Sequence, residues 1–138
     1  MVSKKALREA KNDALIEELI KDPLYKINRD GTIFTRITKN GQGVSKEWRQ
    51  VGYKKPDGYV RFRYKGEFLF VQRVIYRKYI GKLDKNLTIN HINLDNSDNR
   101  VENLEQISQR ENNNKKRKKY KKAAFNIILR LFNRDKGE

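Results

Sequence analysis

The chain has 138 residues and no cysteine, and its 33 lysines and arginines outnumber 17 aspartates and glutamates, giving a net charge of +16. This length allows one compact domain or two very small modules, so we expect no large enclosed cavity for a small-molecule substrate. The lack of cysteine excludes disulfides and thiolate zinc sites. The charge predicts a polyanionic partner. Nucleic acid is favoured, and an anionic membrane surface is the alternative.

No apolar run approaches the length of a bilayer span, and no secretory signal opens the sequence. We therefore expect an intracellular, cytoplasmic protein. Residues 1–22 predict an amphipathic helix, because Ser3 is a suitable N-cap and Asp22 precedes Pro23, where helix is disfavoured. We expect this helix to cover a sheet. The alternative is DNA contact through its basic residues, which are Lys4, Lys5, Arg8 and Lys11.

Residues 23–66 predict a small β-hairpin module. Segments 25–27 and 32–37 read as strands around an Asp-Gly turn, and the polar segment 39–47 reads as a loop. Segments 59–64 and 67–71 read as a second hairpin with one apolar and one basic face. The basic face carries Arg61, Arg63 and Lys65. Such a ribbon fits the DNA major groove; the alternative is a solvent-exposed face of a half-buried sheet.

Residues 71–80 change to a helical period, and Gly81 is a suitable helix end. Residues 87–114 then predict a strand, a loop rich in Asn and Asp, a second apolar run and a helix beginning near Ser108. Ser108 and Glu111 have the spacing of a capping box. The only histidine, His91, lies at the end of the first of these strands.

This stretch resembles the HNH (ββα-metal) nucleases, in particular the small homing endonucleases encoded by phages and introns. The resemblance is carried by Asn90-His91, the loop 93–99, Glu102-Asn103-Leu104 and Asn112. It implies that His91 is the general base, that Asn103 positions the loop and the base, and that Asn90 and Asn112 bind one Mg²⁺ or Mn²⁺ ion. Residues 25–37 resemble, more weakly, a module found ahead of this motif in phage homing enzymes.

One position departs from the best metal-binding members of that family, which have Asp where this chain has Asn90. A neutral amide is a weaker ligand for a hard cation than a carboxylate. Three explanations remain open: the scissile phosphate supplies the negative charge, Asp95 or Asp98 contributes, or the protein is a slow or inactive member. The resemblance also implies that Arg73 or Arg77, on the preceding helix, reaches the phosphate.

Residues 115–122 contain seven basic residues in eight. We expect phosphate contacts from this run, which includes Lys115, Lys116, Arg117, Lys118 and Lys119. The apolar segment 123–132 is expected to pack on the body or on a second copy of the chain.

The prediction is an α+β fold, with a ββα-metal nuclease motif preceded by a β-hairpin module and flanked by N- and C-terminal helices. Its segments are the helix 1–22, the hairpin module 23–66, the nuclease core 67–114 and the basic helix 115–138. The predicted function is metal-dependent hydrolysis of double-stranded DNA by a monomer or weak dimer. The alternatives are a catalytically weak DNA-binding protein of the same fold and an RNA-binding protein.

Overall fold

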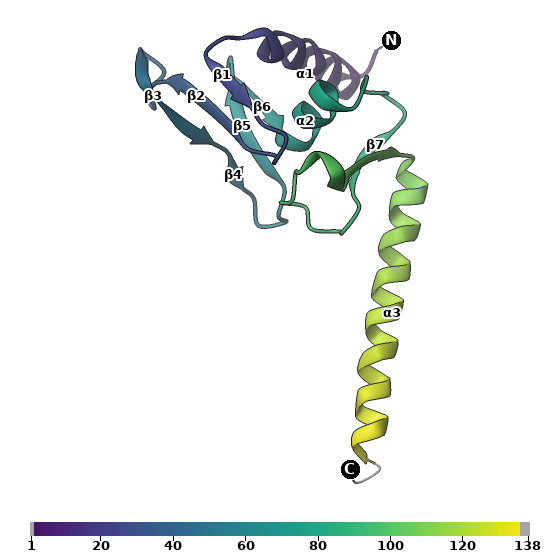
Figure 1. Cartoon of the computed structure of the whole chain (residues 1–138). Coiled ribbons are helices and arrows are strands. Elements are labelled where there is room, and N and C mark those ends of the chain that lie inside the picture. The colour runs from purple at the N-terminus through teal and green to yellow at the C-terminus, as the bar shows by residue number, and fades with distance from the viewer. Residues whose placement is uncertain (1, 136–138) are drawn as a thin grey trace.

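The computed structural model describes residues 2–135 and confirms the α+β class (Figure 1). The elements follow in the order α1 (Lys4–Lys21), β1 (Tyr25–Ile27), β2 (Ile33–Ile37), β3 (Val44–Val51), β4 (Tyr53–Lys54), β5 (Val60–Tyr64), β6 (Glu67–Phe70), α2 (Val71–Tyr79), β7 (Thr88–His91), the 3₁₀ turn η1 (Val101–Asn103), β8 (Leu104–Ile107) and α3 (Gln109–Asp135). No helix within the described residues is long and apolar enough to cross a bilayer.

The strands form three small antiparallel sheets, ordered β1-β2-β3, β4-β5-β6 and β7-β8. The expected loop 39–47 is too long, because β3 already begins at Val44, which pairs with Ile37. Backbone hydrogen bonds to β2, across a register shift after Thr35, order this polar segment despite its weak apolar pattern. The loop is thereby reduced to a turn, in which the Thr38 amide donates to the Gly43 carbonyl over 2.9 Å.

One hydrophobic core joins α1, the first two sheets, α2 and the β7–β8 ribbon. Its buried members are Ile16, Leu19, Ile27, Ile33, Phe62, Tyr64, Leu69, Val71, Val74, Ile75, Ile89 and Leu104. α2 contacts β5 and β6 as well as β7 and β8, so it fixes the ribbon against the rest of the body. The predicted packing role of α2 agrees with this arrangement.

α1 packs on α2 and β6 as expected, and the Ala6 amide donates to its N-cap Ser3. Its face toward the body combines apolar residues with charged ones. The ion pairs that fasten it are Lys11–Glu67, Asp13–Arg73, Glu17–Arg77 and Glu18–Lys65. Arg73 and Arg77, which were expected near the phosphate, form two of these pairs. The Arg73 guanidinium lies 2.6 Å from the Asp13 carboxylate, and both arginines hold α1 on α2.

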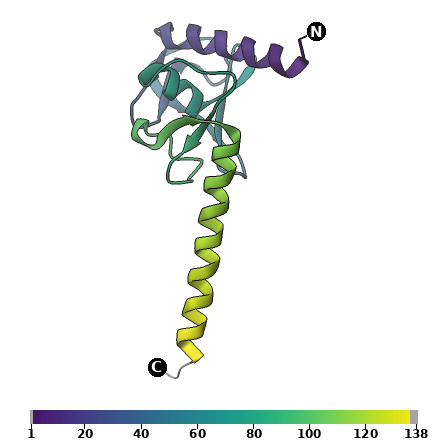
Figure 2. The same cartoon turned by 90° about the vertical axis from the view of Figure 1, so that its right-hand side faces the viewer.

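α3 leaves the body as one long helix (Figures 1 and 2). The expected packing of its apolar part on the body is wrong. Large apolar side chains remain exposed along it: Tyr120, Phe125, Ile127, Ile128, Leu129, Leu131 and Phe132. Among the described residues of α3, the buried one is Asn112 in the first turns, where the helix meets β7.

Candidate active site

The β7–β8 ribbon carries the predicted site residues in a defined register. His91 pairs with Leu104, and Asn90 pairs with Glu105. Since successive residues of a strand point to opposite faces, His91 and Asn90 project from different faces of the ribbon. The helix that follows β8 brings Asn112 back toward β7, where it is only 5% exposed.

His91 is buried, with 2% of its surface exposed, and its Nε2 lies 2.7 Å from the amide oxygen of Asn99. That oxygen can only accept, so Nε2 carries the proton of the neutral ring and Nδ1 is left as the basic nitrogen. Burial lowers the pKa of His91, while the hydrogen bond to Asn99 and the charges of Asp95 and Asp98 oppose this shift. The ring is therefore neutral near pH 7, as a general base requires.

Asn99 is a site residue that sequence reasoning missed, since nothing in the Asn-rich loop distinguished it from its neighbours. It is 4% exposed, because the β1–β2 turn presses on it. Gly31 makes this approach possible, with φ of +88° and no side chain. A β-carbon at Gly31 would stand 2.5 Å from the backbone carbon of Asn99. The hairpin module thus supports the partner of the base.

Asn103 fixes the loop between β7 and η1. Its amide oxygen accepts from the Asn93 backbone amide over 3.0 Å. Its Nδ2 donates to the Asn93 side chain over 3.0 Å and to the Asp98 carbonyl over 2.8 Å. Asn99 follows directly after Asp98 in the chain, so Asn103 acts on His91 through the loop and not by direct contact.

The loop carboxylates are engaged in the loop itself. Asp98 accepts from the Arg100 guanidinium over 2.8 Å and from Asn93, and the Arg100 hydrogen bond is the main cause that lowers the pKa of Asp98 to about 2. Asp95 accepts from the backbone amide and hydroxyl of Ser97. Among residues 2–135, neither carboxylate hydrogen-bonds to Asn90 or Asn112; the bonds that both make stabilise the loop.

Asn112 carries an oxygen atom that is available to bind a cation. Its Oδ1 is buried and has no hydrogen-bond partner among the described residues, which is costly unless something else satisfies it. On β7, the Asn90 Nδ2 donates to Glu105 Oε1 over 2.8 Å, and Lys115 on α3 also binds Glu105. No cluster of three His, Cys, Asp or Glu suited to a metal occurs in residues 2–135. The available donors are amide and carboxylate oxygens, which fit a hard cation such as Mg²⁺ or Mn²⁺.

A basic and aromatic surface covers the outer face of the first two sheets. The guanidiniums of Arg61 and Arg63 lie 4.0 and 4.8 Å from the ring centroid of Phe68. On the neighbouring sheet, Lys26 and Arg36 lie over Trp48. Farther along β4-β5-β6, Tyr59 and Phe70 pack edge to face, and the Tyr59 ring centroid lies 5.9 Å from that of His91. The surface therefore leads toward the predicted base.

Lys65 lies at the tip of the same hairpin but pairs with Glu18 of α1 over 3.0 Å. Both side chains are more than half exposed, so the pair is weak and leaves Lys65 exchangeable.

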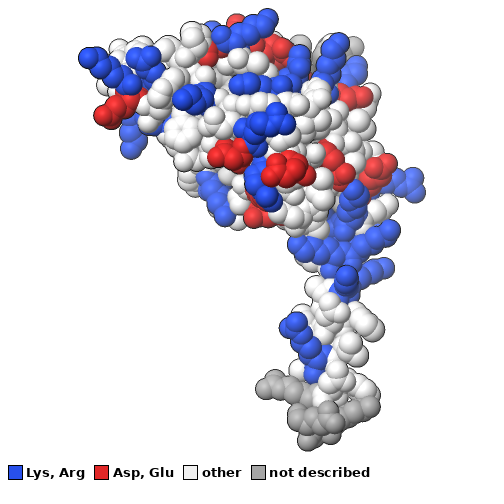
Figure 3. Space-filling view, viewed as in Figure 1, with Lys and Arg blue, Asp and Glu red and all other residues white. Residues whose placement is uncertain are grey.

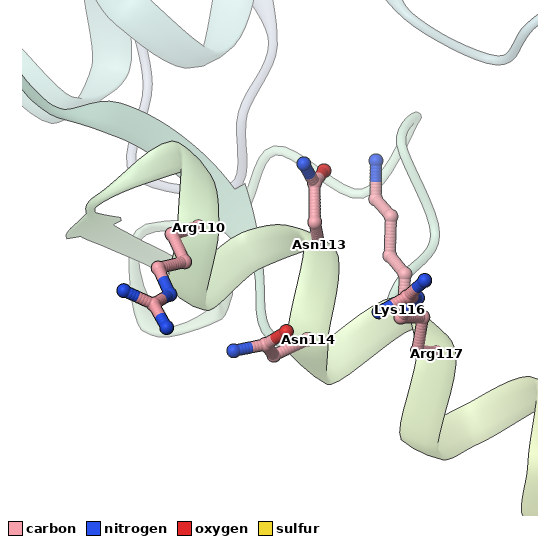
Figure 4. A pocket seen from close by; sticks show the side chains of 5 residues that line it. All are labelled: Arg110, Asn113, Asn114, Lys116 and Arg117. Carbon is pink, nitrogen blue, oxygen red and sulfur yellow. The ribbon is translucent and has the colours of Figure 1, made fainter.

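Lys and Arg also gather along α3 where it leaves the body (Figure 3). A shallow hollow there is lined by Arg110, Asn113, Asn114, Lys116 and Arg117 (Figure 4). All five side chains come from one helix, so the hollow is an open helix face and not an enclosed pocket. The charge of Lys116 also lowers the pKa of His91, which places this end of the helix near the base.

Residues 69–114 match the family model described as HNH endonuclease. Among solved structures, the fold is similar to the HNH homing endonuclease I-HmuI, solved in work on DNA binding and cleavage by that enzyme. The TM-score is 0.58 at 18% sequence identity, over 75% of this chain and 56% of the other, so the chain spans little more than half of that protein. No curated protein matches the chain.

The family match contains both the β7–β8 ribbon and the start of α3, and it ends just after Asn112. The predicted resemblance is thereby confirmed, and residues 69–114 are an HNH endonuclease domain.

Proposed function

We propose that the protein is a metal-dependent endonuclease that hydrolyses phosphodiester bonds of double-stranded DNA. The observation that carries the proposal is the state of His91: buried, with a lowered pKa, its Nε2 bonded to Asn99 and its Nδ1 left as the base. A buried neutral histidine whose Nε2 is held by Asn99 is suited to accept a proton at its other ring nitrogen. The family match at residues 69–114 supports the same chemistry.

In this proposal, Nδ1 of His91 takes a proton from a water molecule, which attacks the scissile phosphorus in line with the leaving 3′ oxygen. Asn99 holds the ring in the required tautomer and stabilises the imidazolium that forms. Asn90 and Asn112 would hold a Mg²⁺ or Mn²⁺ ion, which when bound would supply positive charge for the leaving oxygen. The products are a 5′-phosphate and a 3′-hydroxyl. A monomer nicks one strand, and a dimer cuts both.

The DNA contacts in this proposal come from two surfaces. Arg61 and Arg63, with Lys65 at the hairpin tip, face the duplex from the outer sheet surface. The run Lys115, Lys116, Arg117, Lys118 and Lys119 on α3 contacts phosphates on the other side of the base. Phosphate contacts of this kind position the duplex without reading its sequence, and they weaken with salt.

Relaxation of supercoiled plasmid tests the function, with Mg²⁺, with Mn²⁺ and with a chelator. We expect cleavage by the wild type only with metal, and loss of at least about 100-fold in rate for His91→Ala, the usual contribution of a general base. DNA affinity should stay within a few fold, because the base makes no phosphate contact.

Equal cleavage by His91→Ala would contradict the assignment of the base. Metal-independent binding without cleavage by the wild type would instead favour the catalytically weak DNA-binding protein, for which the neutral Asn90 is the specific argument. Competition with double-stranded RNA in the binding assay separates both from the RNA-binding alternative.

A further inference from the structure

The predicted metal site lacks a charged ligand at Asn90, yet a carboxylate lies directly beside that residue. Glu105 faces Asn90 across the ribbon, and the Asn90 Nδ2 donates to Glu105 Oε1 over 2.8 Å. This bond turns the amide so that its nitrogen is engaged by Glu105, which leaves the Asn90 oxygen as its remaining donor atom.

Asn112 and Lys115 bring α3 to the same place. They are three residues apart, so they lie on one face of the helix. Lys115 binds Glu105, which shows that this face of α3 is turned to the ribbon at Glu105. The buried, unpartnered Oδ1 of Asn112 lies on that face, one turn before Lys115. The Asn90–Glu105 pair of the ribbon and the Asn112 oxygen of α3 therefore lie in the region where α3 meets the ribbon, and together they offer two amide oxygens and one carboxylate.

We propose that Glu105 supplies the carboxylate ligand of the divalent-metal site, and that the Lys115 ammonium occupies the cation's place until the metal binds. This inference rests on the proposed function and names a ligand for its metal. Binding of the metal releases Lys115 from Glu105, and the ammonium then becomes available for a DNA phosphate.

Glu105 suits this role better than the loop carboxylates. Asp98 is held by the Arg100 guanidinium and Asn93, and Asp95 is held by Ser97, so either would have to abandon the loop. Within the described part of the chain, the Glu105 carboxylate has Asn90 and Lys115 as its hydrogen-bond partners.

The Lys115–Glu105 pair is also open to exchange. The Lys115 side chain is 48% exposed and that of Glu105 is 31% exposed, so water can replace the ammonium at little cost. A divalent cation attracts the carboxylate more strongly than an ammonium does, because it carries twice the charge at a shorter distance. Lys115 and the metal therefore compete for one carboxylate.

Mn²⁺ binding without DNA, followed by isothermal calorimetry and by the electron spin resonance signal of free Mn²⁺, tests the proposal. The variants are Glu105→Gln, Lys115→Met, the double variant Glu105→Gln/Lys115→Met and the control Lys122→Met. Lys122 lies two turns farther along the same face of α3 and loses the same charge. Thermal melting monitored by circular dichroism compares folding of all variants.

We expect Glu105→Gln to weaken Mn²⁺ binding at least about tenfold, the loss typical of disturbed metal sites. Lys115→Met should tighten binding by about threefold or more, because the competing cation is gone. The control should leave binding unchanged. The double variant separates two roles of Glu105: it stays weak if Glu105 is a ligand, and it binds like the wild type if Glu105 only neutralises Lys115.

Wild-type affinity in the double variant, or no change in Lys115→Met, would overturn the corresponding half of the proposal. Absence of a Mn²⁺ site in the wild type and in Lys115→Met would overturn all of it. The plasmid assay distinguishes these results from failure of the proposed function. A protein that cleaves DNA but binds Mn²⁺ independently of Glu105 refutes only the inference, and one that binds Mn²⁺ through Glu105 without cleaving refutes only the function.

Discussion

The two sides of the β7–β8 ribbon are built differently. On one side, His91, Asn99 and Asn103 are all buried; Nε2 of His91 bonds to Asn99, and the Asn103 side chain bonds to Asn93 and Asp98. On the other side, Glu105 and Lys115 are partly exposed, and the buried Asn112 keeps an unpartnered oxygen. The proposed base, His91, is thus fixed before any substrate binds. The proposed metal ligands Glu105 and Asn112 are not yet in their metal-bound arrangement.

The difference follows from what each side has to do. A proton acceptor works best when its tautomer and orientation are set in advance, since no reorganisation is then needed during the reaction. A site that must admit a hydrated cation needs exposure and a partner that can leave. We call the side with His91, Asn99 and Asn103 the fixed side, and the side with Glu105, Lys115 and Asn112 the exchangeable side. Variants that weaken contacts on the fixed side or strengthen metal binding on the exchangeable side test this difference.

The largest effect is expected for Asn99→Ala on the fixed side. Loss of the hydrogen bond to Nε2 removes control of the tautomer, so kcat should fall about 100-fold with little change in DNA affinity. That bond raises the pKa of His91 against burial, so its loss lowers the pKa further. The rate falls as pH drops through this pKa and the ring is protonated, and this fall should move to lower pH in the variant.

Asn96→Ala is the matched control, because its amide donates to the Asp57 carbonyl of the β4–β5 turn and not to the base. Rate profiles against pH for both variants give the comparison. Equal kcat and an unmoved acid limb in Asn99→Ala would mean that Asn99 only fills space beside the ring.

A smaller effect is expected for Asn103→Ala, which removes three hydrogen bonds from the loop. The Asn93 amide and the Asp98 carbonyl lose their partner, so the free energy of unfolding should fall by about 2 kcal/mol. Urea denaturation measures this loss. The exposed Asn113, which accepts only from Gln109 on α3, serves as the control, and Asn113→Ala should change stability by less than about 0.5 kcal/mol. Equal losses of unfolding free energy in both variants would mean that Asn103 does not hold the loop beside His91 in place.

The smallest effect, with opposite signs in two measurements, is expected for Asn90→Asp. The new carboxylate faces Glu105 over the 2.8 Å that the amide bridged, so the metal-free protein should melt at a lower temperature. With Mg²⁺ the same pair shares the cation, and the concentration needed for half-maximal cleavage should fall several-fold. Melting without metal and cleavage against Mg²⁺ concentration provide the two readings. A variant that melts lower but shows an unmoved Mg²⁺ curve would exclude residue 90 from the metal site.

Much of the fold was accessible from local patterns in the sequence. Ser3, the Asp-Gly turns and the alternation from Tyr59 to Val71 predicted α1 and both hairpins near their observed bounds. The start of β3 was not predicted, because Val44 to Glu47 is ordered by pairing with β2 and has little apolar pattern of its own. The ion pairs of Arg73 and Arg77 were not predicted for a related reason, since their carboxylate partners lie 60 residues earlier in the chain.

The candidate site was likewise predictable only in part from local sequence patterns. The motif spacing proposed His91, Asn90, Asn103 and Asn112 as candidate site residues, because a family resemblance is carried by short intervals in the sequence. Glu105 was missed because its position opposite Asn90 depends on the register across the loop and η1, which no local pattern specifies. Asn99 was missed because its burial depends on Gly31 in another hairpin.

The length of α3 sets the distance between the candidate site and the apolar end of the helix. At 1.5 Å per residue, the apolar stretch from Phe125 to Phe132 stands roughly 20 to 30 Å beyond Asn112, approaching one turn of B-form DNA. A partner that binds this far end would therefore lie nearly one turn of B-form DNA away from the bond that the protein is proposed to cut. The length of the helix, more than its composition, would thus set how far from the proposed cleavage position a second attachment can lie.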